Sequence, residues 1–424
     1  MSLNFDAIHI GELHSFATET AGPLSPSQIA SQLQPLRDAY LQIREGRVTG
    51  LGAMTDYPPP VNADIPQRSL AGKTVIPGLV DPHTHLVFGG SREHELVARI
   101  AKQRDVQPSK GERMASGINY TVQCTREASK DELAQGALRR LDQMLLHGTT
   151  TAEAKSGYGL NLNQELKLLE TVQELKHLHP IHLVSTFLGA HAVPQGVSME
   201  DYVAQVLKMI PVVAERGLAQ FCDVFCETGF FSVEDSRQIL KLASFHGMKL
   251  KVHADELDHS GGAALAAELG AVSADHLQFA SEADLKAMKA AGTLPVVLPG
   301  TAFYLGLPYA NTALMHQLDM PIAISTDLNP GGCYCESQLM MVVLAVTQMQ
   351  MLPVEAFVGV TRNAAYAIDC GDRAGVLAPG RAADFVVLDA PNLDYVPYHF
   401  GVNLVEDVYI GGEKLVSAGA LLKA

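Results

Sequence analysis

From residue 75 to about residue 370, apolar runs rich in β-forming residues alternate with amphipathic helical patterns, and this alternation restricts the fold most strongly. Parallel strands need a crossover connection, usually a helix, so the alternation is typical of a parallel sheet in an α/β protein. We count eight strands in this region. They are Val80–His85, Thr149–Lys155, Ile181–Leu188, Phe221–Glu227, Lys249–Glu256, Val272–Leu277, Leu294–Leu298 and Pro321–Asp327.

Several of the intervening helices begin with a clear capping signal. Ser129 and Glu132 form a capping box, in which the serine accepts from a free amide and the acid lies at the positive end of the helix dipole. Similar pairs with aspartate in the fourth place begin at Ser198, Ser232 and Ser281. Eight strand–helix units over about 290 residues predict a (β/α)8 TIM barrel, a fold that uses about 250 residues. A doubly wound sheet is the alternative, but it rarely has eight strands without a nucleotide-binding fingerprint.

The two ends of the chain have a different pattern. Tyr40–Val48 and Val48–Met54 predict a hairpin, and Ala383–Leu388 and Val405–Val416 predict short strands near the C-terminus. Neither end is long enough for a stable sheet, so we expect the two ends to form one small β-sandwich together. The predicted domains are a discontinuous β-sandwich of residues 1–75 and 378–424 and a barrel of residues 76–377.

The composition excludes several kinds of partner. The chain carries 46 acidic and 31 basic residues, so nucleic acid is not expected, because phosphate binding needs clustered lysine and arginine. No apolar run approaches the roughly 18 residues that span a bilayer, and no basic stretch precedes an apolar one at the N-terminus. We therefore expect neither a membrane segment nor a secretion signal. Six cysteines without a CxxC pair fit free thiols in a reducing cytoplasm.

Two histidines close the first predicted strand. Side chains on a strand alternate between faces, so His83 and His85 lie on the same face. Two neighbouring imidazoles provide half of a metal site, and imidazole suits zinc, iron and similar ions. The other ligands must come from elsewhere in the chain.

In barrels of this kind the catalytic side chains lie at the carboxyl ends of the strands. His253 ends the fifth strand and Asp327 ends the eighth, so three nitrogens and one oxygen can surround one ion and leave a place for water. A bound divalent ion lowers the pKa of its water from about 15.7 toward 7. Glu256 and His276 end neighbouring strands and are candidates for proton transfer. Glu153 and Lys155, at the second strand end, fit a simple ion pair.

Seven segments of the chain resemble the imidazolonepropionase family within the amidohydrolase superfamily, and the resemblance runs nearly from end to end. The Lys-Ser-Gly-Tyr-Gly-Leu and Asp-x-Asn-Pro-Gly elements are specific to that branch. The matching segments are Pro77–His85, Lys155–Leu160, Phe187–His191, His253–Glu256, Ala274–Leu277, Leu298–Gly300 and Ser325–Gly331.

The resemblance implies hydrolysis of 4-imidazolone-5-propanoate to N-formimidoyl-L-glutamate, a step of histidine degradation. It also implies a homodimer and one divalent or trivalent ion, zinc or iron. The implied metal ligands are His83, His85, His253 and Asp327. The implied catalytic residues are Glu256, His276 and Asp327. The implied substrate-binding residues are Arg92, Tyr158, His191, Glu256, Asn329, Gly331 and Gly332.

Two departures and two alternatives bear on this reading. Gly332 stands where the family often has serine or threonine, so only backbone can serve there, and no lysine ends the fourth strand, which argues against a two-metal site. A purine or pyrimidine deaminase would use the same metal ligands, but Arg92 and Tyr158 suit a substrate that carries a carboxylate. A metal-binding protein without catalysis would have no open coordination place, whereas Glu256 beside His253 suggests a positioned water.

Overall fold

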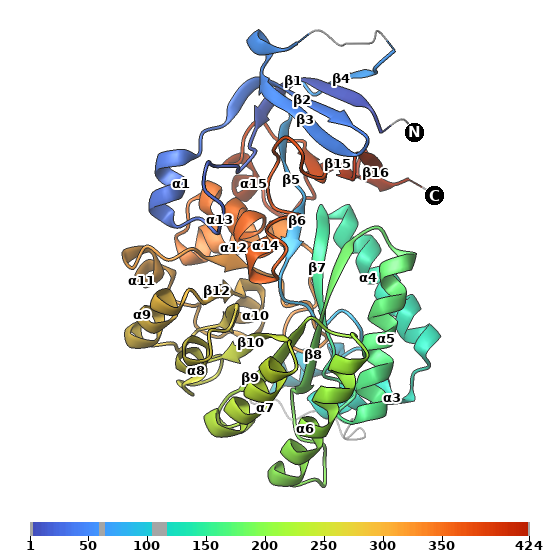
Figure 1. The fold of residues 1–424 in the computed structure, drawn as a ribbon, viewed down its shortest axis with the longest axis vertical. Coiled ribbons are helices and arrows are strands. Elements are labelled where there is room, and N and C mark those ends of the chain that lie inside the picture. The colour runs from blue at the N-terminus through green and yellow to red at the C-terminus, as the bar shows by residue number, and fades with distance from the viewer. Residues whose placement is uncertain (1–2, 59–63, 104–116, 423–424) are drawn as a thin grey trace.

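A computed structural model of the chain describes residues 3–58, 64–103 and 117–422. Two sheets and a surrounding set of helices make up this part of the chain (Figure 1). Among the described residues, no helix is both long and apolar enough to cross a bilayer.

The eight predicted barrel strands are present, all parallel, and paired in chain order. A bridge between Thr84 and Leu328 connects the first strand region to the last, so the sheet is a nearly closed barrel. The first strand is shorter than predicted because Pro82, which has no N–H for the ladder, follows it. The strands are β6 (Leu79–Asp81), β7 (Thr149–Lys155), β8 (His182–Ala190), β9 (Phe221–Cys226), β10 (Lys249–Ala254), β11 (Ser273–His276), β12 (Leu294–Val297) and β13 (Ala323–Ile324).

The helices begin where the capping signals predict. The Ser129 side chain accepts from Glu132 N at the start of α4, and Ser198, Ser232 and Ser281 do the same at the starts of α6, α7 and α9. The helices are α1 (Pro26–Gln32), α2 (Glu93–Gln103), α3 (Ile118–Glu127), α4 (Lys130–Leu146), α5 (Leu162–Leu178), α6 (Met199–Glu215), α7 (Val233–Phe245), α8 (Gly262–Glu268), α9 (Glu282–Ala291), α10 (Pro299–Leu305), α11 (Thr312–Gln317), α12 (Gln338–Met349), α13 (Pro353–Gly359), α14 (Arg362–Ala367) and α15 (Tyr395–Tyr398).

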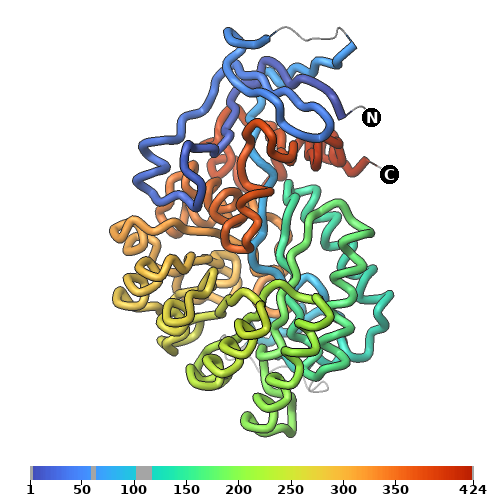
Figure 2. Tube along the Cα trace, viewed as in Figure 1, coloured from blue at the N-terminus to red at the C-terminus, as the bar shows by residue number. Residues whose placement is uncertain are grey.

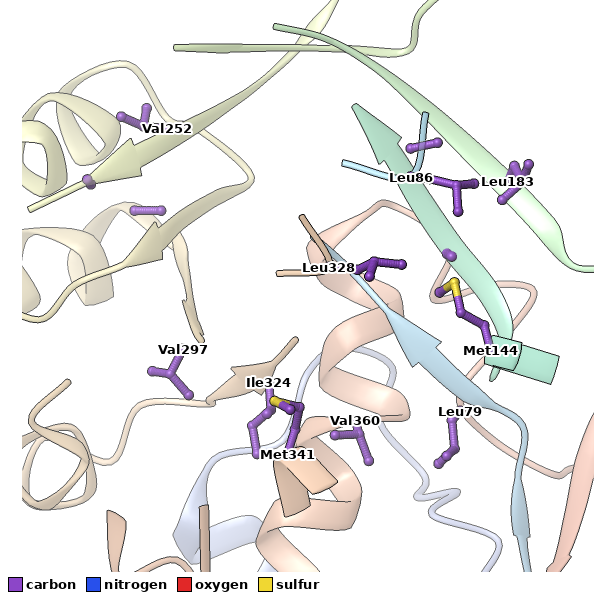
Figure 3. Packing of buried hydrophobic residues seen from close by; sticks show 14 of the residues in the cluster. Leu79, Leu86, Met144, Leu183, Val252, Val297, Ile324, Leu328, Met341 and Val360 are labelled. Atoms are coloured by element: carbon purple, nitrogen blue, oxygen red, sulfur yellow. The ribbon is translucent and has the colours of Figure 1, made fainter. Parts of the chain in front are cut away.

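The main apolar core lies between the barrel strands and the helices around them. Figure 3 shows Leu79 of β6, Met144 of α4 and Met341 of α12 among these side chains. All three are fully buried, and burial of such side chains contributes roughly 1.5–3 kcal/mol each before the entropy cost of folding. The core therefore fixes the strands, and with them the positions of the strand ends.

The two ends of the chain form one mixed sheet in the order β17-β16-β15-β14-β5-β1-β2-β3, with β4 paired to β1. The predicted hairpin is β2–β3, and the predicted C-terminal strands are β14, β15 and β16. The members of this sheet are β1 (Phe5–Leu13), β2 (Leu36–Arg44), β3 (Arg47–Ala53), β4 (Gln67–Ser69), β5 (Thr74–Pro77), β14 (Phe385–Leu388), β15 (Val405–Ile410), β16 (Glu413–Ser417) and β17 (Ala420–Leu421); the 3-10 helix η1 (Met54–Asp56) follows β3.

This sheet curls over its own core, as the predicted sandwich requires. Val48 N donates to Arg381 O at 3.0 Å and Ala383 N donates to Gly46 O at 2.9 Å, so the β3 edge returns to the chain just before β14. The enclosed core includes Phe5, Phe385 and Tyr409, whose rings are in contact. Figure 2 shows the blue N-terminal and red C-terminal segments side by side at one end of the barrel. The division into domains at residues 75 and 378 stays a prediction.

Candidate active site

A cavity of about 300 Å³ opens at the carboxyl ends of the barrel strands. All seven predicted substrate-binding residues line it, as do three of the four predicted metal ligands. His83 lies beneath the cavity and is fully buried. The lining residues are His85, Arg92, Ile118, Tyr158, His191, Phe225, Phe230, His253, Glu256, Leu257, His276, Thr301, Leu305, Asp327, Asn329, Gly331 and Gly332.

Three buried imidazoles converge at the floor of this cavity. His83, His85 and His253 each have one ring nitrogen that lies within 4.8 Å of a ring nitrogen of the other two. The Nε2 atoms of His83 and His253 are buried and have no hydrogen-bond partner within the part of the chain that the structure describes. Burial lowers the pKa of His83 and of His85 well below the usual value, which keeps both rings in the neutral form that binds metals.

Asp327, which follows the last barrel strand β13, lies next to these imidazoles. Its Oδ1 atom lies 3.5 Å from His83 Nε2 and 3.7 Å from His85 Nε2. Ligand atoms around a tetrahedral zinc ion, at ~2.0–2.1 Å from the metal, are roughly 3.4 Å apart. The three imidazoles therefore have the chemistry and spacing to hold a metal ion, and the Asp327 carboxylate lies next to two of them.

Two aspartates orient the imidazoles from below. His83 Nδ1 lies 2.6 Å from Asp275 Oδ2, and His253 Nδ1 lies 2.9 Å from Asp223 Oδ2. At His83 the hydrogen-bonded carboxylate at Nδ1 fixes the tautomer that leaves Nε2 free to bind a metal, and at His253 the Asp223 carboxylate makes an ion-pair contact with Nδ1. Asp223 lies inside the fourth predicted strand and Asp275 near the end of the sixth, but their partners depend on the barrel register, which the sequence does not give.

Glu256 and His276 lie together at the edge of the cavity. His276 Nε2 is 3.7 Å from Glu256 Oε2. Burial raises the pKa of Glu256 to about 8, and the nearby carboxylates of Asp327 and Glu227 add to this rise. His276 has a φ of +81° and Asp327 a φ of +53°, a left-handed conformation that is uncommon outside glycine and that often occurs at functional sites. Because its pKa is raised to about 8, Glu256 can exchange a proton near neutral pH.

Arg92 reaches the cavity from the loop before α2. Its Nε donates to Glu95 Oε1 at 2.9 Å and its Nη2 donates to Glu95 Oε2 at 2.8 Å. The remaining nitrogen, Nη1, lies against Gly331, where any added Cβ would overlap it. The Glu95 carboxylate thus fixes the guanidinium while Nη1 stays next to the cavity.

Tyr158 and His191 form the wall beside His85. The His191 ring stacks on His85 with centroids 4.9 Å apart, and His191 Nδ1 lies 3.1 Å from Gly157 O. Burial lowers the pKa of His191 to about 3, so the ring is neutral. With its Nδ1–H directed to Gly157 O, His191 has Nε2 as a free acceptor.

The last loop closes the cavity on the side of Asp327. Asn329 Oδ1 accepts from the backbone N–H of Gly331 and of Gly332, and Asn329 Nδ2 donates to Asp327 O. The Gly332 N–H, which the sequence left as a candidate substrate contact, is therefore used inside the loop. The Asn329 side chain therefore stabilises the conformation of this loop.

A model described as the amidohydrolase family matches residues 74–415. Among curated relatives, the imidazolonepropionase of Alkaliphilus metalliredigens (strain QYMF) is 47% identical over 399 residues, which cover 91% of this chain and 92% of that protein. The imidazolonepropionase of Bacillus velezensis (strain DSM 23117 / BGSC 10A6 / LMG 26770 / FZB42) is 44% identical over 414 residues, 96% of each chain. The chain belongs to the imidazolonepropionase family of amidohydrolases.

Solved structures of other amidohydrolases share the fold of this family member. E. coli guanine deaminase superposes with a TM-score of 0.70 at 17% identity, covering 98% of this chain and 99% of that one. An adenosine deaminase from Xanthomonas campestris with bound zinc superposes with a TM-score of 0.68 at 18% identity, covering 100% and 94%. At these identities the likeness shows the fold alone.

The imidazolonepropionase-family cavity also contains residues that the sequence analysis missed. Thr301 Oγ1 donates to Asp327 Oδ2, and the Phe225 ring packs against His253 at 5.7 Å between centroids. Thr301 follows the Leu298–Gly300 motif by one position, which is the only sequence signal for it. Nothing in the local sequence marks Phe225, because its place depends on which face of β9 turns inward.

Proposed function

We propose that this chain hydrolyses the ring amide C–N bond of 4-imidazolone-5-propanoate and releases N-formimidoyl-L-glutamate. One observation carries the proposal: the cavity that Arg92 lines has at its floor three clustered histidines that could hold a cation, with the Asp327 carboxylate beside two of them. Membership of the imidazolonepropionase family supports the same reaction. A neutral purine or pyrimidine base has no negative charge to pair with the Arg92 guanidinium.

We propose zinc or iron as the ion, held by His83, His85, His253 and Asp327, because imidazole and carboxylate accept both. When bound there, the ion supplies an activated water and polarises the ring carbonyl. The buried Nε2 atoms of His83 and His253, which have no partner among the described residues, fit this role.

The cavity wall binds and orients the substrate. Arg92 Nη1 donates to the propanoate carboxylate, a charge-assisted contact that favours an anionic substrate. Tyr158 and His191 contact the ring, with His191 Nε2 as an acceptor for a ring N–H. Thr301 holds the Asp327 carboxylate in place, and the apolar side chains of Phe225 and Leu305 exclude bulk water.

Proton transfer falls to Glu256 and His276. Because the pKa of Glu256 is raised to about 8, its carboxyl group can take up a proton at one step and release it at the next near neutral pH. The adjacent His276 Nε2 lies 3.7 Å from this carboxyl group, and both side chains line the cavity. The leaving ring nitrogen receives a proton from this pair or from Asp327.

The test follows loss of the imidazolone ring absorbance with freshly made 4-imidazolone-5-propanoate and metal-loaded protein, with guanine and cytosine as controls. The proposal predicts turnover of the imidazolone and neither base. In Arg92→Ala, kcat/KM for this substrate should fall about 10–150-fold, the loss of one or two hydrogen bonds to a charged group. Deamination of either base at a comparable rate, or unchanged kcat/KM in the variant, would overturn it.

We further propose a homodimer with no nucleic-acid or membrane partner, located in the cytoplasm. The six cysteines are free thiols, as in a reducing compartment, and the net charge of −15 disfavours nucleic acid. Light scattering at micromolar concentration measures the subunit number, and a monomer would contradict this part of the proposal.

A further inference from the structure

Two lysines lie inside the barrel directly beneath the candidate active site. The side chains of Lys155 on β7 and Lys251 on β10 have no exposed surface, and neither lines the cavity. The interior of such a barrel is usually filled by branched aliphatic side chains. A buried ammonium group is costly unless it is paired, so these two lysines need a reason to be there.

Lys155 forms ion pairs with two carboxylates. Its Nζ donates to Asp223 Oδ2 at 2.7 Å and lies 2.8 Å from Glu153 Oε2. Glu153 is held on its other oxygen by the Thr186 hydroxyl. The predicted ion pair of Glu153 and Lys155 is therefore present, but it extends to a carboxylate on the next strand but one.

Lys251 ties a second part of the same cluster together. Its Nζ donates to Pro82 O at 2.9 Å and lies 3.4 Å from Asp275 Oδ2 and 3.5 Å from Glu153 Oε2. The carboxyl groups of Glu153, Asp223 and Asp275 and the amino groups of Lys155 and Lys251 make up this buried cluster below the imidazoles.

The cluster reaches the imidazoles through its two aspartates. Asp223 Oδ2, the oxygen that accepts from Lys155, is also 2.9 Å from His253 Nδ1. Its Oδ1 accepts from the backbone N–H of Val224 and of His253. Backbone N–H groups thus hold Oδ1, and Oδ2, the oxygen to which Lys155 donates, is the one next to the His253 ring.

We propose that Lys155 is a positioning residue for the cation site: it holds Asp223 in the orientation that fixes the His253 ring with Nε2 toward the cation. Lys155 touches neither the cavity nor any predicted ligand. Its shortest contact toward the imidazoles is the 2.7 Å bond to Asp223, whereas Asp275 Oδ2, the other carboxylate oxygen next to a ligand, lies 3.8 Å from its Nζ. This inference rests on the proposed metal site. It gives a role to a residue of the Lys155–Leu160 motif that the proposed reaction leaves unused.

The test measures zinc affinity by chelator competition, and the visible spectrum of the cobalt-loaded protein, in Lys155→Met, Asp223→Asn and the double variant. Loss of a partner that orients a metal ligand typically weakens binding 10–100-fold. We expect that loss in each single variant, together with changed cobalt bands. The double variant should bind zinc no more weakly than Asp223→Asn, because Lys155 acts through Asp223.

Lys167→Met is the matched control. Lys167 Nζ donates to three main-chain carbonyls, of Thr125, Arg126 and Ala128, outside the cavity, so its loss should lower thermal stability without changing zinc affinity. The double variant removes one positive and one negative charge. If Lys155→Met alone does not fold, the zinc affinity of the double variant relative to that of Asp223→Asn still tests the proposal.

Two outcomes overturn the proposal for Lys155: wild-type zinc affinity in Lys155→Met, or a double variant that binds zinc tenfold more weakly than Asp223→Asn. Wild-type protein that binds no zinc would instead overturn the metal site on which the proposal stands.

Discussion

At the scale of single residues, the contact between Arg92 and Gly331 positions the guanidinium that we propose binds the substrate carboxylate. Glu95 accepts from Nε and Nη2, so Nη1 is the guanidinium nitrogen that has no bond to Glu95. Gly331 leaves the space that Nη1 occupies. The sequence predicted Arg92 and Gly331 as pocket residues, but not their contact, since they are far apart in the chain and meet only when the barrel closes.

Gly331→Ala should raise KM for the imidazolone substrate about tenfold or more with little change in kcat, because the new methyl group displaces Arg92 Nη1. Gly332→Ala is the control. A Cβ at Gly332 would lie 3.2 Å from Asn329 Nδ2, an approach that a small shift relieves, and KM should change less than threefold. Equal KM values in the two variants would contradict the placement of Arg92.

Glu256→Gln should reduce kcat about 10²–10⁴-fold, because an amide of the same shape cannot carry the proton. Its metal content, measured by elemental analysis, should match that of the wild type, since Glu256 is not among the four expected ligands. Loss of the metal from this variant would make Glu256 a ligand and contradict the assignment.

At the scale of elements, the place where each strand ends determines which side chains line the site. The β7 strand has the predicted bounds Thr149–Lys155, because seven buried residues are bounded by a glycine at one end and a Ser-Gly turn at the other. The first strand ends at Asp81, so strand alternation does not place His83 and His85, but their ring centroids still lie 5.4 Å apart. Missed features depend on register: Asp275 meets His83 only because β11 and β6 face each other across the barrel.

The His182 imidazole lies at the start of β8 and has a shifted pKa. Burial lowers the pKa of His182 to about 4, and Arg373 and Lys176 add to this. Below about pH 6.5 the unfolded chain binds a proton here that the folded chain does not accept until about pH 4. Stability contributed by this group is therefore lost as the pH falls from 6.5 to 4.

His182→Gln should accordingly lose less stability than the wild type between pH 7 and pH 5. The difference should be on the order of 1 kcal/mol, after allowance for the solvent that reaches this side chain. Denaturant titrations of both proteins at the two pH values measure it. Equal losses of stability in wild type and variant would contradict the effect of burial on His182.

At the scale of the whole molecule, the sheet from the chain ends and the barrel are joined through β5 and β6, so the site lies at the end of the barrel away from that sheet (Figure 1). The repeated strand–helix pattern predicted the barrel. The sheet was predicted only in part: β1 was missed because a bulge between Ala7 and Ile10, with His9 at a φ of +52°, breaks the two-residue alternation.

Removal of the cation should lower the thermal midpoint by several °C, and added zinc should restore it. A ligand that binds only the folded chain stabilises it by about 2.7 kcal/mol at a hundredfold excess over its Kd. Chelator-treated protein, with elemental analysis to confirm the loss, is compared with the reloaded protein by calorimetry. Identical midpoints would show that the four side chains hold no cation that matters to the fold.

Anomalous diffraction from crystals of the fully active protein, at the zinc and iron absorption edges, tests the central claim most directly. One peak is predicted, at ~2.0–2.2 Å from a nitrogen of each of His83, His85 and His253 and from a carboxylate oxygen of Asp327. Active crystals with no such peak, or with the ion bound elsewhere, would contradict the account.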